Sequence, residues 1–145
     1  MHWLASRGAT VAIPVGSSRD WDLVAELHGR LLRVQVKTST CFVKERWDAT
    51  LCTRGGNQSW NGLVKRLDAS RFDYLFVLVG DGRRWFIPAV KVGGDTGLRV
   101  GGPKYAEFEV DQGDPIPAAR VPSPPLQSAS PSTRGDARAA KGTRL

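Results

Sequence analysis

The chain consists mainly of short apolar or alternating runs separated by polar, glycine-rich segments, which predicts a fold of short strands. A helical fragment over His2–Arg7 is expected to end at Gly8, because glycine is a common stop signal. The continuous apolar run Tyr74–Val79 is typical of a central, buried strand. The other expected elements are strands over Ala9–Val15, Trp21–Leu27, Leu31–Thr38, Trp47–Thr53, Trp85–Ile87 and Lys104–Val110, and a turn or short helix over Pro88–Val92.

Residues 21–38 alternate between apolar and polar side chains around a turn signal and therefore predict a β-hairpin. Because successive side chains of a strand point to opposite faces, the apolar positions share one face and the polar positions share the other. With Gly29 and Arg30 as a two-residue turn, Asp22 is expected opposite Lys37. The charged and amide side chains of the polar face are Asp22, Glu26, Arg33, Gln35 and Lys37.

An acid on one strand and a polar residue two positions before a lysine on the next strand suit metal-assisted hydrolysis of a phosphodiester. The Asp22 carboxylate can bind a hard divalent cation, and Gln35 can complete or orient its ligand shell. Lys37 can stabilise the developing negative charge or hold the attacking water. From these residues alone, an ordinary solvated face with the salt bridges Asp22–Lys37 and Glu26–Arg33 is the open alternative.

The run IPVGSSRDWDLVAELHGRLLRVQVKT (residues 13–38) resembles the PD-(D/E)XK nuclease superfamily. More narrowly, it resembles the group I intron-associated, bacterial homing-endonuclease branch, in which glutamine replaces the acid of the lysine motif. The matching positions are Ile13-Pro14, Asp22 and the motif Gln35-Val36-Lys37-Thr38. The later runs DYLFVLVGDGRRWFIPAVKV and KYAEFEV extend the resemblance to roughly residues 9–110. The resemblance implies an α/β fold with a restriction-endonuclease-like core, a mixed central sheet and few short helices.

The resemblance further implies a divalent-metal-dependent DNA endonuclease, with Asp22, Gln35 and Lys37 as catalytic residues and Mg²⁺ or Mn²⁺ held by Asp22 and Gln35. Cutting both strands of double-stranded DNA needs two sites, so we expect a homo-oligomer. The family's N-terminal helix normally carries a glutamate, whereas this chain has none before Glu26, so we expect that helix to be truncated. Two alternatives stay open: a catalytically inactive DNA-binding protein on the same fold, and a small β-rich interaction module.

Composition divides the chain into an expected nuclease-like domain over residues 1–114 and a basic tail over residues 115–145. The tail holds six of the nine prolines, five of the 21 basic residues and one of the 14 acidic residues. With few large apolar residues to bury, it is expected to be disordered. The net charge of +7 favours a polyanionic partner such as DNA. The residues expected to contact DNA are Arg54, Asn57, Trp60, Lys65 and Arg66.

The composition also excludes several classes of protein. No apolar run approaches the roughly 18 residues of a membrane span, so we expect no membrane partner. The first residues lack the charged-then-apolar pattern of a signal peptide, and two cysteines cannot build a disulfide framework. We therefore expect a cytoplasmic protein.

Overall fold

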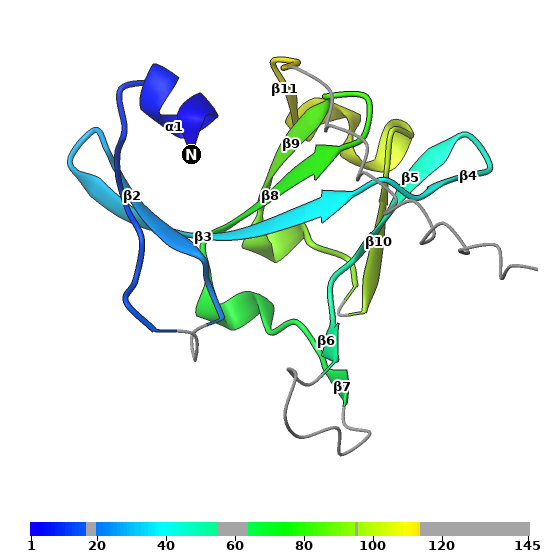
Figure 1. Cartoon of the computed structure of the whole chain (residues 1–145), viewed down its shortest axis with the longest axis horizontal. Helices are drawn as coiled ribbons and strands as arrows, with labels where there is room; N and C mark the ends of the chain where they lie inside the picture. Colours follow the sequence, from blue (N-terminus) through cyan, green and yellow to red (C-terminus); the bar gives the residue numbers. More distant parts are fainter. Residues whose placement is uncertain (17–19, 55–63, 95, 114–145) are drawn as a thin grey trace, which may run out of the picture.

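The computed structural model describes residues 1–16, 20–54, 64–94 and 96–113, which form short strands joined by turns and very short helices (Figure 1). Within these residues, no helix is long and apolar enough to cross a bilayer. The expected tail, from residue 115 onward, lies outside the described residues. The strands are β1 (Thr10–Ala12), β2 (Leu23–Leu27), β3 (Arg30–Ser39), β4 (Phe42–Val43), β5 (Arg46–Thr50), β6 (Thr53–Arg54), β7 (Val64–Lys65), β8 (Tyr74–Val79), β9 (Arg84–Pro88), β10 (Gly97–Val100) and β11 (Glu109–Val110). The helices are α1 (His2–Ser6) and three 3₁₀ turns, η1 (Ala69–Arg71), η2 (Ala89–Lys91) and η3 (Pro103–Phe108).

A mixed six-stranded sheet forms the centre of the fold, in the order β1-β2-β3-β8-β9-β11. The central pair, β3 and β8, is parallel, and every other neighbouring pair in this sheet is antiparallel. The expectation of a mixed central sheet with few short helices is therefore confirmed. The parallel pair needs a long connection, and the segment between β3 and β8 contains β4 to β7 and η1.

The two faces of this sheet carry separate apolar clusters. In the parallel register of β3 and β8, Gln35 lies beside Leu75 and Lys37 beside Val77, so these side chains share one face. A second sheet, in the order β10-β5-β4, packs on that face and contributes buried residues to the same cluster. The opposite face is covered by α1 through Leu4. In Figure 1 the second sheet lies at the right-hand end of β3, and α1 lies beside β2.

The hairpin of β2 and β3 has a different turn from the expected one. Leu27 pairs with Arg30, so the turn consists of His28 and Gly29, and the predicted Gly29-Arg30 turn is wrong. Both turn residues have positive φ angles, 51° and 77°, as a type I′ turn requires. The pairing shifts by two residues, so Leu23 lies opposite Val34. Because side chains alternate with a period of two, the shift leaves the predicted faces unchanged.

Two segments near the end of the described chain also differ from expectation. The run Lys104–Val110 forms η3 followed by the short strand β11, because Tyr105 and Phe108 are three residues apart and both pack into the core, which suits a 3₁₀ turn. Pro103 begins that turn, and the Tyr105 hydroxyl accepts a hydrogen bond from the Gly93 N–H at 3.1 Å. The strand β10 was not predicted. It pairs with β5, with Leu98 opposite Ala49.

Candidate active site

Asp22 lies directly before β2 and extends the pairing with β3 by one position. Its N–H donates to the Val34 carbonyl at 2.9 Å. Its Oδ2 accepts hydrogen bonds from the Val36 N–H at 2.7 Å and from Gln35 Nε2 at 2.5 Å. Asp22 therefore lies opposite Gln35, and not opposite Lys37 as the expected turn required. The carboxylate is held by a backbone and a side-chain donor, yet Asp22 is exposed to solvent.

Gln35 is buried, with only 7% of its surface exposed. It lies on the face that carries the larger apolar cluster, beside Leu75 of the parallel strand. A buried amide needs hydrogen-bond partners, and Gln35 meets this need through the Asp22 carboxylate. A polar residue is needed at position 35, because an apolar residue there would remove one of the hydrogen-bond donors to the Asp22 carboxylate.

Lys37 follows Gln35 by two residues on β3 and so points to the same face, about 7 Å further along the strand. It is partly buried and lies beside Val77. No ion pair involves Lys37 in the described part of the chain, nor does Glu26 pair with Arg33 there. The alternative of an ordinary salt-bridged face is therefore wrong for these pairs, and the Lys37 ammonium stays available to a ligand.

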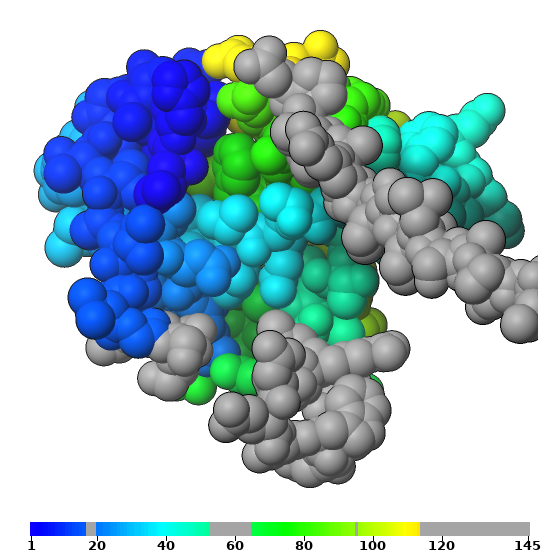
Figure 2. All heavy atoms as spheres, in the orientation of Figure 1, coloured from blue at the N-terminus to red at the C-terminus, as the bar shows by residue number. Residues whose placement is uncertain are grey.

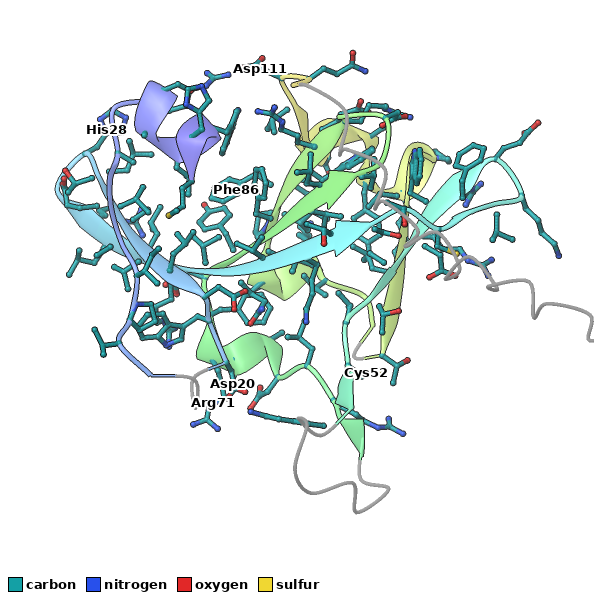
Figure 3. All side chains as sticks on the ribbon, viewed as in Figure 1. Asp20, His28, Cys52, Arg71, Phe86 and Asp111 are labelled. Atoms are coloured by element: carbon teal, nitrogen blue, oxygen red, sulfur yellow. The ribbon has the colours of Figure 1, made fainter. Side chains whose placement is uncertain are left out.

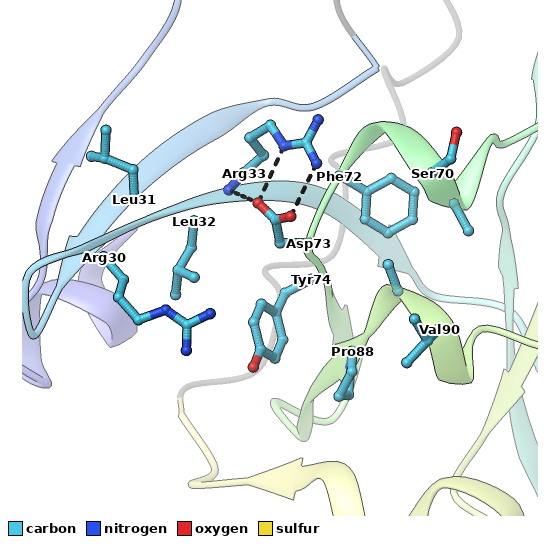
Figure 4. Close-up of a pocket in the computed structure, with 12 residues that line it drawn as sticks. Arg30, Leu31, Leu32, Arg33, Ser70, Phe72, Asp73, Tyr74, Pro88 and Val90 are labelled. Atoms are coloured by element: carbon cyan, nitrogen blue, oxygen red, sulfur yellow. Dashed lines mark hydrogen bonds and ion pairs between the residues drawn. The ribbon is translucent and has the colours of Figure 1, made fainter.

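Arg33, the third polar side chain on this face of β3, is bound to Asp73 instead. Its Nε and Nη2 donate to Asp73 Oδ2 and Oδ1 at 3.2 and 3.0 Å, and its N–H donates to Oδ2 at 2.8 Å (Figure 4). The hydrogen bonds from Arg33 hold the pKa of Asp73 below its ordinary value, although partial burial opposes this shift. The contact lies where the pairing of β3 with β8 begins. It also lies in the wall of a cavity of about 420 Å³ that Asp22, Gln35 and Lys37 do not line.

Asp20 lies three residues before β2 and forms ion pairs with the segment that contains β7 and η1. Only 10% of its side chain is exposed, and it forms ion pairs with Lys65 and with Arg71, the latter at 2.9 Å between Nε and Oδ2 (Figure 3). Sequence reasoning missed both Asp20 and Asp73 as partners of basic residues. Each lies far along the chain from its partner, and no local pattern of spacing connects them.

The residues expected to contact DNA are only partly described. Lys65 belongs to β7 and forms an ion pair with Asp20, although 60% of its side chain remains exposed. Arg66 is exposed. Arg54 belongs to β6, where its backbone pairs with Val64. Asn57 and Trp60 lie outside the described residues.

The oxygen ligands that Asp22 and Gln35 offer suit a hard cation whose remaining coordination positions are filled by other ligands. Among the described residues, no group of three or more His, Cys, Asp and Glu side chains lies together. Mg²⁺ commonly takes one or two carboxylates and fills its remaining positions with water and phosphate oxygens. Gln35 presents its nitrogen to Asp22, and a half-turn of the amide would place its oxygen there instead. Asp22 and Gln35 could thus hold such a cation together with water and a DNA phosphate.

Comparisons with known proteins identify the family of the chain. A family model described as PD-(D/E)XK endonuclease matches residues 1–108. A solved structure of a bacterial homing endonuclease, I-Ssp6803I, is similar in fold, with a TM-score of 0.61 and 19% sequence identity over 74% of this chain and 79% of that one. A comparison with curated proteins found no match. The family match covers most of the chain and includes the hairpin that carries Asp22, Gln35 and Lys37, and the chain therefore belongs to the PD-(D/E)XK endonuclease family.

Proposed function

We propose that this protein is a divalent-metal-dependent endonuclease that hydrolyses phosphodiester bonds in double-stranded DNA, in the manner of a homing endonuclease. The observation that carries the proposal is the contact between Asp22 and Gln35 on the same face as Lys37, which no ion pair in the described chain neutralises. If these side chains served only to stabilise the surface, we would expect an ion pair between Lys37 and Asp22, and the described residues form none. The family to which the chain belongs supports the same reading.

In this proposal the three side chains have separate roles. Asp22 supplies the carboxylate that holds Mg²⁺ or Mn²⁺, and Gln35 orients that carboxylate and turns its oxygen toward the cation. The cation, when bound, lowers the pKa of water and stabilises charge on the scissile phosphate. Lys37 places its ammonium beside the phosphate and stabilises the negative charge that develops in the transition state.

The proposal includes a symmetric homo-oligomer, because one site cuts one strand and the strands of a duplex run in opposite directions. Lys65 and Arg66 would contact phosphates, together with Arg54, Asn57 and Trp60 of the segment that follows β5. When DNA is bound, phosphates would compete with Asp20 for Lys65.

Replacing Lys37 by alanine tests the proposal. We expect Lys37→Ala to abolish Mg²⁺-dependent nicking or cleavage of plasmid DNA while duplex binding changes less than about threefold, because the lysine serves the transition state more than the ground state. Asp22→Asn should likewise abolish cleavage. Lys91→Ala, which removes an exposed lysine from η2, is the matched control and should leave cleavage unchanged. Full cleavage by Lys37→Ala would contradict the proposal, as would unfolding of that variant.

The inactive DNA-binding alternative rests on one observation, that Asp22 is the only carboxylate in the hydrogen-bonded group of Asp22, Gln35 and the Val36 N–H. Gln35→Glu supplies a second carboxylate for the cation. If the protein binds DNA but does not cleave it with Mg²⁺ or Mn²⁺, the alternative holds. Cleavage that appears only in Gln35→Glu would show that the scaffold is intact and lacks one acid.

A further inference from the structure

The hairpin of β4 and β5 carries an exposed apolar and basic tip. Phe42 is 57% exposed and Val43 is 42% exposed, and both stand on a two-stranded ribbon. Lys44 and Glu45 form its turn with φ angles of 50° and 61°, and Arg46 follows the turn. All three of these charged residues are exposed. In the space-filling view the ribbon, coloured cyan to teal, projects from the right-hand side of the molecule (Figure 2).

Contacts at its base hold the ribbon against the rest of the fold, so the exposed side chains stand on a fixed element. The rings of Phe42 and Trp47 lie 4.8 Å apart between centroids. Trp47 donates from Nε1 to Asp81 Oδ2 at 3.2 Å. The Trp47 ring also lies so close to Gly80 that a Cβ at that position would meet two of its carbons at 3.0 and 3.1 Å. These contacts fix the ribbon to the turn between β8 and β9.

The ribbon also lies near the candidate site. It belongs to the sheet that packs on the face carrying Gln35 and Lys37. Ser39, at the end of β3, donates from its hydroxyl to the Asp48 carbonyl at 2.5 Å and accepts from the Cys41 N–H at 3.1 Å. These bonds link β3 to β5 and to the residue directly before β4. Phe42 follows Lys37 by five residues, a span of at most about 18 Å.

The size and charge of the ribbon match a DNA groove beside the scissile phosphate. The major groove of B-DNA is about 12 Å wide and admits a two-stranded β-ribbon, and the methyl group of thymine lies in that groove. Lys44 and Arg46 outnumber the single acid Glu45 at the tip, so the tip complements phosphates on the groove edges. The paired positions Val43 and Arg46 share one face of the ribbon, which combines an apolar and a cationic contact.

We propose that the β4–β5 ribbon enters the major groove next to the scissile phosphate, with Val43 contacting thymine methyl groups and Lys44 and Arg46 contacting phosphates. This inference rests on the proposed function, since it places DNA against the exposed Asp22 and the partly exposed Lys37. It assigns the ribbon to DNA recognition and leaves the chemistry of cleavage to Asp22, Gln35 and Lys37.

The chain offers a close control for testing the ribbon. Val43-Lys44 and Val90-Lys91 are both exposed Val-Lys pairs, the first on the ribbon and the second on η2. The test variant is Val43→Ser/Lys44→Asn, in which asparagine tolerates the positive φ of position 44. The control variant is Val90→Ser/Lys91→Asn. Both variants keep the apolar core and should unfold within about 2 °C of the parent.

The probes are alternating dA-dT and alternating dA-dU duplexes, which differ in the methyl group that the major groove presents. We expect the parent to bind the dA-dT duplex about threefold to tenfold more tightly than the dA-dU duplex. The ribbon variant should lose that difference, bind the dA-dT duplex at least about tenfold more weakly and show a salt slope lower by about one, since one phosphate contact is gone. The control variant should keep the parent's affinity for both duplexes within about twofold.

Several results would overturn the ribbon proposal. Equal affinity of parent and ribbon variant would do so, as would a change of oligomeric state in the ribbon variant alone, which would identify the ribbon as a protein interface. Displacement of the parent by distamycin, a minor-groove ligand, would assign binding to the other groove. Because these readouts measure binding, they are separate from the cleavage test. A parent that binds but never cuts contradicts the proposed catalysis alone, whereas a parent that does not bind contradicts both proposals.

Discussion

Three aspartates near the candidate site differ in their partners, and the difference decides what each can do. Asp20 and Asp73 are neutralised by basic side chains, whereas Asp22 accepts hydrogen bonds from a backbone N–H and a neutral amide. Neutral donors orient a carboxylate without cancelling its charge. Of the three, Asp22 is therefore the one whose charge is left for a cation, while Asp20 and Asp73 hold segments of the chain together.

Asp73→Asn should lower the melting temperature at pH 7, because asparagine keeps the shape of the side chain but loses the charge that attracts Arg33. The pKa of Asp73 is lowered in the folded protein, so its contribution to stability is present above the ordinary pKa of about 3.9 and is lost as the pH falls through the lower folded value. Thermal unfolding from pH 7 to pH 2.5 should therefore show the gap between parent and variant closing in acid.

The matched control for this change is Asp111→Asn, which removes the exposed carboxylate paired with Arg7 and should change the melting temperature little at any pH. A gap between parent and Asp73→Asn that stays constant down to pH 2.5 would contradict the assignment, because it would show that the charge of Asp73 is not what stabilises the contact.

At the scale of elements, β3 joins the parts of the fold that the proposed chemistry requires. It pairs with β2 on one side and with β8 on the other, and it leads into the β4–β5 ribbon at its end. Gln35 and Lys37 lie beyond the residues of β3 that pair with β2. Their positions are set by the pairing with β8 and, for Gln35, by the contact with Asp22. The geometry of the site thus depends on the turn that sets the β2–β3 register.

His28→Asn should stabilise the protein by a few tenths to about 1 kcal/mol, because asparagine followed by glycine is the preferred pair in a type I′ turn and tolerates the positive φ of 51°. His28→Val should destabilise it, since a β-branched residue disfavours that φ. The midpoint of urea unfolding measures both changes. Loss of stability in His28→Asn would show that the histidine side chain, which lines a cavity with Trp3 and Phe86, contributes more than the turn does.

At the scale of the whole molecule, the two faces of the central sheet differ, because only one of them carries the candidate site. The face under α1 is occupied by apolar side chains. The face under the second sheet combines a larger apolar cluster with the polar group at Asp22, Gln35 and Lys37. The last described strand, β11, pairs with β9 at the edge of the sheet and ends at Val110. All strands of the described sheet and all described members of both apolar clusters thus precede residue 114.

Deleting residues 121–145 should weaken DNA binding and reduce its dependence on salt, because the deletion removes four basic residues and one acidic residue from a chain of net charge +7. The melting temperature should change little, since the last described core residue is Phe108 and the last described strand ends at Val110. Affinity for random duplex DNA at several salt concentrations and a thermal melt of each protein measure both effects. A large fall in melting temperature would show that the C-terminal residues stabilise the fold.

The alternation of residues 21–38 was sufficient to predict that Asp22, Gln35 and Lys37 share a face, because the period of two is a local property of an extended backbone. The run Tyr74–Val79 was likewise predicted with the bounds that β8 has, since a continuous apolar strand buried on both faces needs no partner to be recognised. The family resemblance rested on the same local features and is confirmed.

Tertiary structure decided which of these side chains touch. The turn at His28 and Gly29 placed Asp22 opposite Gln35, and the parallel pairing with β8 buried that glutamine. Arg33 binds Asp73, which lies 40 residues further along the chain, beyond strands β4 and β5 of the second sheet. Local periodicity sets the direction of a side chain but not its neighbour across the sheet, because strand register and long-range ion pairs depend on how distant segments pack together.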